Sequence, residues 1–379
     1  MRVLIACGGT GGHINPGLAI ADIIKSKYPD AEFLFAGTPK GMESKLVPKA
    51  GYRLETIKVA GFQRKISFEN IGRNAKAVAY LAASGKRAKE IIKNFKPDIA
   101  IGTGGYAAGP VIRKAAKMGI PTAIHEQNAY PGVTNKLLSK EVDFVMLTVI
   151  EALDFMDKSK FEYSVTGLPV RSNINTMSKA EARKKLGMDD SFTILSFGGS
   201  LGAGCINDTM TETIKWHTKN NLRINHIHGY GGMGKDSFPQ AMKEAGIPLK
   251  SNRLRITEYI NDMDVCLAAA DLVICRSGAS TLAELEAAGK ASILIPSPIV
   301  AGNHQYHNAM VLGKAGAAVV IEQKDVTNDK IIAEIENLYN SPDKVEIMSE
   351  CAAKLHLSDT NSRIIAVIDK LLSKGTLSP

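Results

Sequence analysis

The sequence lacks any run of about 18 or more uncharged apolar residues, the length that a helix needs to cross a membrane. Its first residues, MRVLIACGG, contain one basic residue and pass directly into glycines, which does not fit a signal peptide. Cysteines are few, odd in number and scattered, at Cys7, Cys205, Cys266, Cys275 and Cys351. This usage argues against a disulfide framework and is typical of reduced, mostly buried side chains in a cytoplasmic protein.

Several motifs are also missing. The glycine-rich loop at residues 8–12 lacks G-x-G-x-x-G spacing, and the next predicted strand, Glu32–Ala36, ends without the acidic residue that holds a ribose in dinucleotide folds. No Asp-x-Asp pair follows a predicted strand, and His226 and His228 have no third ligand nearby, so we expect no metal and no cofactor. Without an aromatic-interleaved basic motif, nucleic acid is not an expected partner.

Positive charge is present, but it is unevenly placed. Residues 1–167 contain 24 Lys and Arg against 15 Asp and Glu, whereas residues 168–379 contain 23 of each. Phe62–Lys96 alone contains nine basic and two acidic residues. With 379 residues, the chain is long enough for two domains, of which the first would meet an anionic partner. An anionic membrane surface is the interpretation we favour for this charge.

The basic segment includes a predicted amphipathic helix, Phe68–Asn94. Such a helix usually packs on a sheet and leaves its charges in solvent, but an apolar patch ringed by cations also fits a membrane surface. The residues expected to meet the membrane are the cations Arg64, Lys65, Arg73, Lys76, Lys86 and Arg87 and the apolar tip Tyr80 and Leu81. Because the tip is rich in alanine, we expect shallow insertion dominated by electrostatics.

A strand, a glycine-rich turn and a helix occur in this order twice. The first set is Arg2–Cys7, residues 8–12 and Pro16–Ser26, and the second begins with the strand Phe192–Phe197 and ends with the helix Ile206–Thr218. A further glycine turn follows the predicted strand Pro97–Ile101. This repetition predicts an α/β protein with two stacked nucleotide-binding domains.

The stretch Ala270–Asn308 is the most informative. A strand, Leu272–Cys275, is followed by a tight turn and a helix, Ser280–Ala288, which Gly289 closes in the left-handed conformation. A second strand and a polar loop, Gly302–Asn308, come next. Ligands of open α/β sheets lie beyond the carboxyl ends of the strands, and a helix N-terminus suits phosphate. Glu284, one turn into the helix, can accept hydrogen bonds from paired sugar hydroxyls, so we predict a sugar-nucleotide site.

Polar residues also follow the predicted strand Pro121–His125. His125, Glu126 and Asn128 can converge on a ligand rich in hydroxyls, although His125 fits a hydrogen-bonded structural role equally well. Further along, Arg171 lies in a segment punctuated by glycine and proline, which we interpret as the crossing between the domains. From there Arg171 can reach a phosphate or a base.

Six motifs together resemble the MurG family, the bacterial enzymes that add N-acetylglucosamine to lipid I. They are GGTGGHINPGLAIA, GTGGYAAGP, IHEQNAYPGVTNKLL, VTGLPVR, CRSGASTLAEL and NHQYHNA. The resemblance implies the GT-B fold: Rossmann-like domains 1–167 and 168–355 facing a cleft, and a C-terminal helix, 356–379, that returns to the first domain. It also implies an inverting transfer from UDP-N-acetylglucosamine to lipid I, for peptidoglycan synthesis and cell division. The setting would be peripheral, on the cytoplasmic membrane face, near other proteins of cell-wall synthesis.

The resemblance also assigns residues. Donor contacts are implied at Thr10, Gly11, Gly12, Asn128, Arg171, Ser200, Ile260, Arg276, Ala279, Ser280, Thr281, Glu284, Gln305 and Asn308. Acceptor or cleft contacts are implied at Tyr106, His125 and Asn135. We expect His13 to be the general base, because imidazole is ordinarily free to accept a proton at neutral pH, and Glu126 is the alternative. Leu201 replaces the family's usual glutamine, which removes a side-chain hydrogen bond there but not the backbone cradle.

Three other functions fit the same fold or site. A diacylglycerol glucosyltransferase would keep the donor half and differ in the basic half. A sugar-nucleotide epimerase would act without an acceptor. A nucleotide-sensing binding protein would show no turnover, so release of UDP on addition of lipid I distinguishes it from the enzymes.

Overall fold

The computed structural model describes residues 1–59 and 83–375, and the chain divides into two compact units. Unit 1 is Met1–Pro169 together with Asp359–Pro379, and unit 2 is Val170–Ser358. These divisions fall two and three residues beyond those expected from the sequence. In the described ranges, no helix is both long and apolar enough to cross a membrane.

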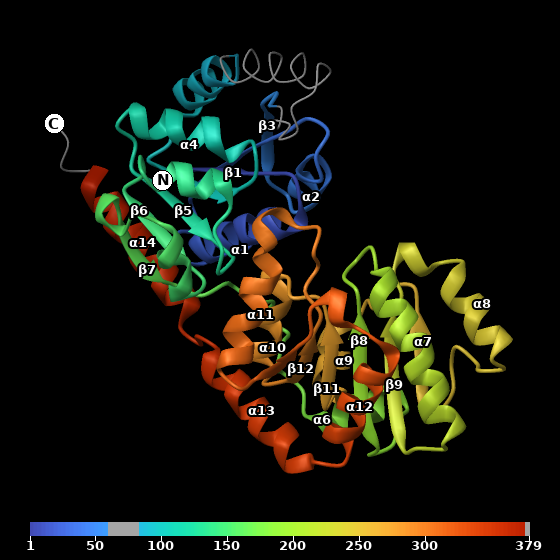
Figure 1. Ribbon diagram of the computed structural model, residues 1–379. Helices are drawn as coiled ribbons and strands as arrows, with labels where there is room; N and C mark the ends of the chain where they lie inside the picture. Colours follow the sequence, from blue (N-terminus) through green and yellow to red (C-terminus); the bar gives the residue numbers. More distant parts are fainter. Residues whose placement is uncertain (60–82, 376–379) are drawn as a thin grey trace. The chain divides into compact units, whose positions relative to one another are not determined.

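Unit 1 is built on a seven-stranded sheet in the order β3-β2-β1-β4-β5-β6-β7, in which all neighbours are parallel (Figure 1). The strands are β1 Arg2–Cys7, β2 Glu32–Gly37, β3 Arg53–Thr56, β4 Ile99–Gly104, β5 Thr122–Glu126, β6 Phe144–Leu147 and β7 Glu162–Val165. Parallel sheets are covered on both faces, so their strands are apolar throughout. Accordingly, Val3 and Ile5 of β1 pack into one core and Leu4 into the other.

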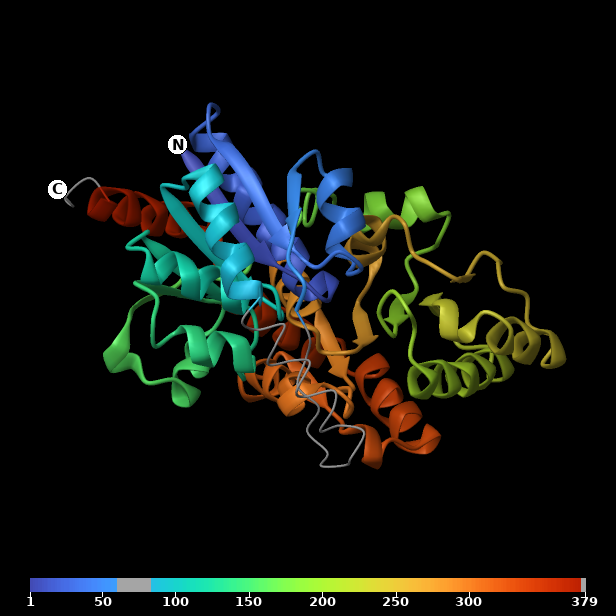
Figure 2. The same ribbon diagram turned by 90° about the horizontal axis from the view of Figure 1, so that it is seen from above.

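Helices cover both faces of this sheet. They are α1 Gly11–Lys27, α2 Glu43–Lys49, residues 83–95, α4 Ala108–Lys117, α5 Val133–Leu138 and α14 Thr360–Gly375, with short 3-10 turns η1 Ile150–Phe155 and η2 Lys158–Lys160. The helix of residues 83–95 lies beside β2 and β3, as the view from above shows (Figure 2). Its Ile91 and Ile92 lie in the same hydrophobic core as Leu34 and Leu4.

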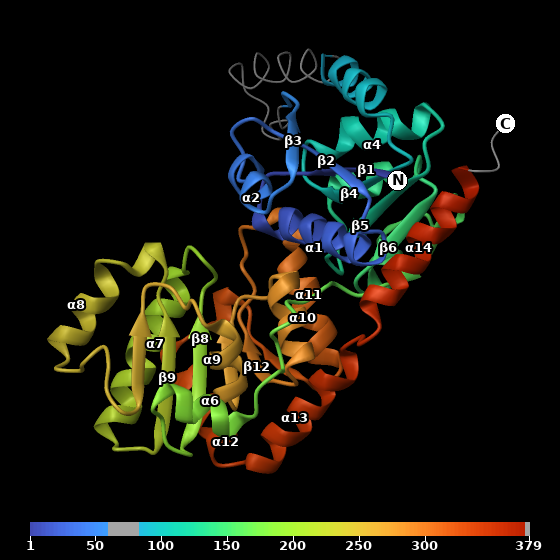
Figure 3. The ribbon, with the colours of Figure 1, turned by 180° about the vertical axis from the view of Figure 1, so that it is seen from behind.

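The C-terminal helix α14 belongs to unit 1, where it lies beside α1 (Figure 3). Asp369 accepts hydrogen bonds from Lys27 Nζ at 2.6 Å and Tyr28 Oη at 2.5 Å, and Arg363 donates to the Val165 carbonyl at 3.1 Å. Its apolar face, including Ile364 and other buried side chains, completes the core beneath α1. The last helix is therefore a structural part of the first unit.

Unit 2 has a six-stranded sheet in the order β10-β9-β8-β11-β12-β13, again with parallel neighbours. The strands are β8 Phe192–Phe197, β9 Ile224–Gly229, β10 Leu254–Thr257, β11 Leu272–Cys275, β12 Ala291–Leu294 and β13 Ala318–Val320. The helices are α6 Lys179–Leu186, α7 Gly204–Lys219, α8 Ser237–Glu244, α9 Met263–Ala269, α10 Ala279–Ala287, α11 His304–Lys314, α12 Asn328–Tyr339 and α13 Pro342–Leu355, with turns η3 Gly232–Gly234, η4 Ala301–Asn303 and η5 Gln323–Asp325.

The two faces of this second sheet are also both buried. Ile194 of β8 packs in the core beneath α7 and α12, whereas Leu195, the next residue, packs in the core beneath α9, α10 and α11. This alternation has the period of two that a strand requires. The helix termini follow the local sequence: Ser178 and Glu181 form the capping box of α6, and Gly289, with φ +57°, ends α10.

Several elements differ from the sequence-based prediction. Helix α1 begins at Gly11 instead of Pro16, which places His13 within its first turn. The predicted polar loop Gly302–Asn308 is the turn η4 followed by the start of α11, so Gln305 and Asn308 are helical. The edge strand β3 was not predicted, because its sequence RLET is short and charged and lacks an apolar pattern.

Candidate active site

The site in unit 1 begins where β1 and β4 end. These strands are adjacent in the sheet but not in sequence, since β2 and β3 extend it on one side and β5 to β7 on the other. The place between β1 and β4, where the strand order reverses, is the topological switch point of the sheet. Open α/β sheets bind ligands at such a point. The two following loops touch, because a Cβ on Gly105 would lie 2.1 Å from the Gly8 carbonyl oxygen, and Gly105 has φ +83°. Only glycine permits this approach.

His13 lies at this switch point, with Thr10 as the N-cap of its helix. The buried Thr103 hydroxyl donates to the His13 carbonyl at 2.7 Å, and Gln127 Oε1 lies 3.1 Å from His13 Nδ1. The ring packs against Gly104, where a Cβ would lie 2.7 Å from Nδ1. The imidazole is therefore held by residues at the ends of β4 and β5 while it stays partly exposed.

His125 is fully buried. Its Nε2 lies 3.0 Å from the Gly167 carbonyl oxygen, and its Nδ1 lies 3.2 Å from Gln127 Nε2. Burial lowers the pKa of His125 to about 4, so the ring is neutral at physiological pH. This geometry supports the structural alternative for His125.

Glu126 is the centre of a second network. Its Oε1 accepts hydrogen bonds from the Asn128 backbone at 2.9 Å and side chain at 3.2 Å, and its Oε2 accepts from Gly132 N at 3.1 Å and Asn135 Nδ2 at 2.8 Å. Only 1% of Glu126 is exposed. Four donors contact the carboxylate, which links the loop between β5 and α5 to the end of β5.

Glu43 holds the first glycine loop in place, a role that the sequence did not predict. This buried carboxylate accepts hydrogen bonds from Thr38 N at 2.7 Å, Thr38 Oγ1 at 2.6 Å and Gly9 N at 3.1 Å. Burial acts to raise the pKa of Glu43, but the hydrogen bonds from Thr38 and Gly9 outweigh it and the pKa is lowered. A buried acidic residue at the start of a short helix gave no pattern that would have indicated this contact.

Unit 2 has its own switch point, between β8 and β11. The turn after β8 is compact, because a Cβ on Gly198 would lie 2.3 Å from the Ala203 amide and one on Gly202, with φ +81°, would lie 2.2 Å from the Tyr230 carbonyl oxygen. Ser200 is exposed on this turn. After β11, Ala279, Ser280 and Thr281 form the partly exposed first turn of α10.

Glu284 lies one turn further along α10, where Arg171 Nε donates to its Oε1 at 2.8 Å. The Glu284 side chain is largely buried and the Arg171 side chain is half exposed. Since the ion pair uses Oε1, Oε2 of Glu284 is left to accept other hydrogen bonds. Two residues that the sequence assigned to one ligand are thus brought together, although they are 113 positions apart.

Comparison with known proteins places these features in a family. Profiles of the glycosyltransferase family 28 N-terminal domain and C-terminal domain match residues 3–147 and 193–364. The UDP-N-acetylglucosamine–N-acetylmuramyl-(pentapeptide) pyrophosphoryl-undecaprenol N-acetylglucosamine transferase of Acetivibrio thermocellus is 46% identical over 374 residues, 98% of each chain. The enzyme of the same name from Desulforamulus reducens is 43% identical over 377 residues, which cover 99% of this chain and 100% of that one.

The chain belongs to the MurG family. The crystal structure of Acinetobacter baumannii MurG has a TM-score of 0.78 and 27% identity, covering 97% of this chain and 99% of the other. A calicheamicin glycosyltransferase, at 15% identity and TM-score 0.67 over the whole of both chains, shares the fold alone. The architecture is the GT-B fold, with two parallel Rossmann-like sheets and a long C-terminal helix.

Several residues that the MurG resemblance assigned to ligands have other partners in the structure. Arg276 donates to the Ile295 and Pro296 carbonyls at 3.0 and 3.1 Å and to Gln323 Oε1 at 2.6 Å, so its guanidinium clamps the end of β12. Asn308 is only 4% exposed and donates to the Ser277 carbonyl at 3.2 Å. Both side chains shape the turn after β11 from within unit 2.

Other assigned residues also contact the protein itself. Asn135 is buried and donates to Glu126 Oε2, and Ile260 packs its side chain over Gly229 in the core. Gln305 is partly buried, and its Oε1 accepts a hydrogen bond from Ser297 N at 2.9 Å. The chemical type of a residue and its motif did not indicate whether its side chain would be buried or exposed.

Other assigned residues are exposed or partly exposed. Tyr106, 64% exposed, lies on the loop after β4. Thr10 and Gly12 are exposed at the start of α1, Gly11 is partly buried, and the Asn128 amide, which contacts Glu126, is partly buried. Thr10, Gly11, Gly12 and Asn128 lie around the first switch point.

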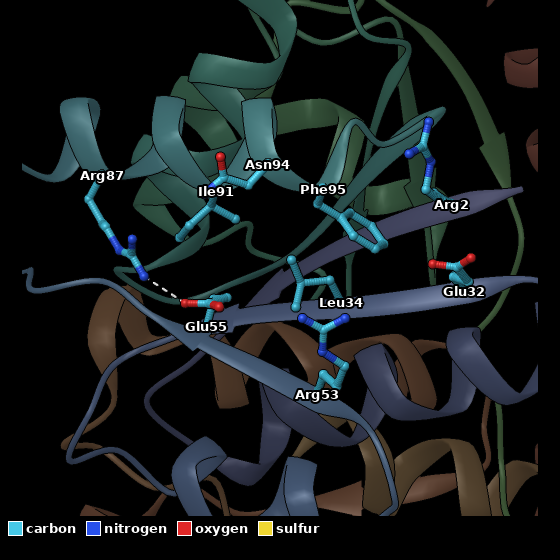
Figure 4. A pocket seen from close by; sticks show the side chains of 9 residues that line it. All are labelled: Arg2, Glu32, Leu34, Arg53, Glu55, Arg87, Ile91, Asn94 and Phe95. Atoms are coloured by element: carbon cyan, nitrogen blue, oxygen red, sulfur yellow. Dashed lines mark hydrogen bonds and ion pairs between the residues drawn. The ribbon is translucent and has the colours of Figure 1, made fainter.

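The basic segment lies partly outside the described residues. Arg64, Lys65, Arg73, Lys76, Tyr80 and Leu81 lie outside the described residues. Lys86 is exposed, whereas Arg87 is paired with Glu55 at 2.6 Å. Figure 4 shows this pair in a pocket of about 230 Å³ between β2, β3 and the helix of residues 83–95, which extends to Arg2 and Glu32 at the amino ends of the strands. The pocket is therefore distinct from the carboxyl-end site.

The histidines of unit 2 form an unexpected cluster. His226 and His228 of β9 contact Ser196 Oγ at 2.8 Å each, and His217 of α7 lies 3.3 Å from His226. A third histidine is thus nearby, which the sequence did not reveal. Within the described residues, no group of three His, Cys, Asp or Glu side chains is arranged to hold a metal ion.

Proposed function

We propose that this chain transfers N-acetylglucosamine from UDP-N-acetylglucosamine to the C4 hydroxyl of the N-acetylmuramyl unit of lipid I, giving lipid II. The observation that carries the proposal is the 46% identity, along 98% of the chain, to an enzyme named for this transfer. The glycine-rich turn after β8 and the first turn of α10, at the switch point of unit 2, agree with it, because backbone N–H groups and a helix N-terminus can bind a diphosphate without metal.

The chemistry is a single displacement. The acceptor oxygen attacks the anomeric carbon, the bond from that carbon to the UDP oxygen breaks, and its electron pair leaves with UDP. The proton of the acceptor hydroxyl moves to His13 Nε2. One in-line displacement inverts the anomeric configuration and needs only one base.

Release of UDP tests the proposal against its alternatives. We expect release with lipid I and none with diacylglycerol or without an acceptor. Release with diacylglycerol would indicate a lipid glucosyltransferase, and conversion of the donor without an acceptor would indicate an epimerase. Donor binding without any release would leave a nucleotide-binding protein.

For the donor, we propose that Glu284 binds the ribose hydroxyls through Oε2. Ser200, Ser280 and Thr281 would bind the diphosphate. Glu284→Ala is then expected to weaken UDP binding by about 1.5–3 kcal/mol, the range for hydrogen bonds to a charged group. Titration calorimetry with UDP measures the change. Glu336→Ala, an exposed glutamate on α12 of the same unit, is the control and should bind normally.

The ion pair with Arg171 provides a second test of this prediction. If Glu284→Ala acts only by leaving Arg171 without its partner, the change will have no effect in an Arg171→Ala background. If Glu284 contacts the ribose, the loss of affinity will persist in that background. Unchanged affinity in both backgrounds would reject the assignment.

For localisation, we propose peripheral binding of unit 1 to the anionic cytoplasmic face of the membrane. The support is the excess of cations in residues 1–167 and the exposed Lys86, Lys89 and Lys93 on the helix of residues 83–95. Arg87 contributes less than its neighbours, because Glu55 neutralises it.

Replacing Lys86, Lys89 and Lys93 with alanine should weaken binding to anionic vesicles roughly 100-fold at low salt. The estimate follows from about 1 kcal/mol per cation at an anionic surface. Vesicle sedimentation measures it, and alanine at Lys219, Lys243 and Lys250, exposed in unit 2, makes the same charge change as a control. Equal binding to neutral vesicles, or equal loss in both triple variants, would contradict the proposal.

A further inference from the structure

A chain of hydrogen bonds runs from the Gly167 carbonyl through His125 and Gln127 to His13. One end of this chain has a fixed polarity. The Gly167 carbonyl oxygen can only accept, so His125 Nε2, 3.0 Å away, must carry a hydrogen. Because His125 is neutral in its buried position, its Nδ1 is then a lone pair that accepts.

This polarity sets the orientation of the Gln127 amide. Gln127 Nε2 lies 2.8 Å from the His125 carbonyl oxygen and 3.2 Å from His125 Nδ1, and both of these are acceptors. The NH2 group must therefore face His125, because the amide oxygen there would meet two lone pairs. Gln127 is buried, so water cannot substitute for either contact.

The orientation of the amide sets the proton on His13. Gln127 Oε1 faces His13 Nδ1 at 3.1 Å and can only accept, so Nδ1 must carry a hydrogen. In a neutral imidazole the other nitrogen, Nε2, is then an unprotonated acceptor. The Thr103 bond to the His13 carbonyl and the close packing of Gly104 keep the ring in register with Gln127.

We propose that Gln127 is a positioning residue that holds His13 in the Nδ1–H tautomer and so keeps Nε2 free to take the proton of the acceptor hydroxyl. This inference rests on the proposed role of His13 as the base. It matters because histidine in water favours the opposite tautomer, with the hydrogen on Nε2. In that form, His13 would have no lone pair at Nε2.

The tautomer can be measured without any turnover. In protein labelled with ¹⁵N-histidine, ¹⁵N shifts and ring couplings distinguish Nδ1–H from Nε2–H, and His13→Ala identifies the signal of His13. We expect the wild-type signal to be Nδ1–H at pH 8 and that of Gln127→Leu to shift toward Nε2–H. A wild-type Nε2–H signal would overturn the proposal, whether or not the variant folds.

Kinetics provide the second readout. Gln127→Leu is expected to lower kcat at least about tenfold while KM for UDP-N-acetylglucosamine stays unchanged, since a wrong tautomer removes the base and not the donor site. Gln240→Leu, an exposed glutamine on α8, is the control. An unchanged tautomer in Gln127→Leu, or a shifted tautomer with full kcat, would overturn the role. A fully active His13→Ala would reject the base itself, while the tautomer result would still stand.

Discussion

Replacing His13 with alanine is expected to lower kcat at least about 100-fold and to abolish the acidic limb of the pH–rate profile. General-base catalysis typically contributes about 10²–10⁴-fold, and alanine leaves no group at this switch point in the same position to accept the proton. UDP affinity should be unchanged, because the proposed donor contacts are in unit 2. Initial rates at saturating donor from pH 5 to 9, with UDP titration of the same variant, measure both quantities.

Glu126 provides the contrasting variant. Its carboxylate accepts four hydrogen bonds, so Glu126→Ala should lower the melting temperature together with activity. His13→Ala, at a partly exposed position, should lower activity with little change in stability. The roles are reversed if Glu126→Ala folds with normal stability and loses the acidic limb while His13→Ala keeps its kcat.

Unit 2 is expected to lose about 4 kcal/mol of stability when the pH falls from 8 to 5.5. Burial lowers the pKa of His217 to about 4 and of His228 to about 3, and burial followed by the charges of its neighbours lowers that of His226 well below 6.5. The folded state therefore keeps the rings neutral, whereas the unfolded chain protonates them below about pH 6.5. The contribution of the neutral rings to the free energy of unfolding is therefore full well above pH 6.5. Below that pH it falls, toward pH 4, by about 1.4 kcal/mol per pH unit for each ring.

The single tryptophan, Trp216, makes this measurable in unit 2, because it lies in α7 next to His217 and packs against the core. Urea unfolding followed by Trp216 fluorescence at pH 8 and 5.5 measures the loss. His217→Leu should reduce the pH dependence by about one third. His304→Gln is the control and should not reduce it, because the His304 ring lies outside this cluster and contacts the exposed Ala301 carbonyl. An unfolding midpoint that is independent of pH in this range would contradict the prediction.

The sequence by itself determined the fold class and the family. Strand, glycine turn and helix are local patterns, because side-chain period, the positive φ of glycine and helix termini depend on neighbouring residues. The turn after β8, the glycine that ends α10 and the six family motifs were therefore readable without a structure. Those motifs were sufficient to locate both switch-point loops, although not to show that β1 lies beside β4.

Tertiary structure decided which polar residues meet one another. His13 and Gln127 are 114 positions apart, and they meet only because β1, β4 and β5 are adjacent in that order. Strand order depends on the packing of the whole sheet, so no local pattern encodes it. The same holds for His217 beside His226, which meet across a helix and a strand.

Burial was the other property that the sequence could not supply. His125, Asn135 and Asn308 have the side chains expected of sugar contacts, yet each is buried and hydrogen-bonded to the backbone of its own unit. Buried polar groups usually pair with the protein, and in these three residues a ring nitrogen or side-chain amide nitrogen lies within hydrogen-bonding distance of a backbone carbonyl oxygen. The sequence therefore specified the chemistry available at each strand end, and the packing of the folded chain decided which of these side chains are buried and which stay accessible to solvent.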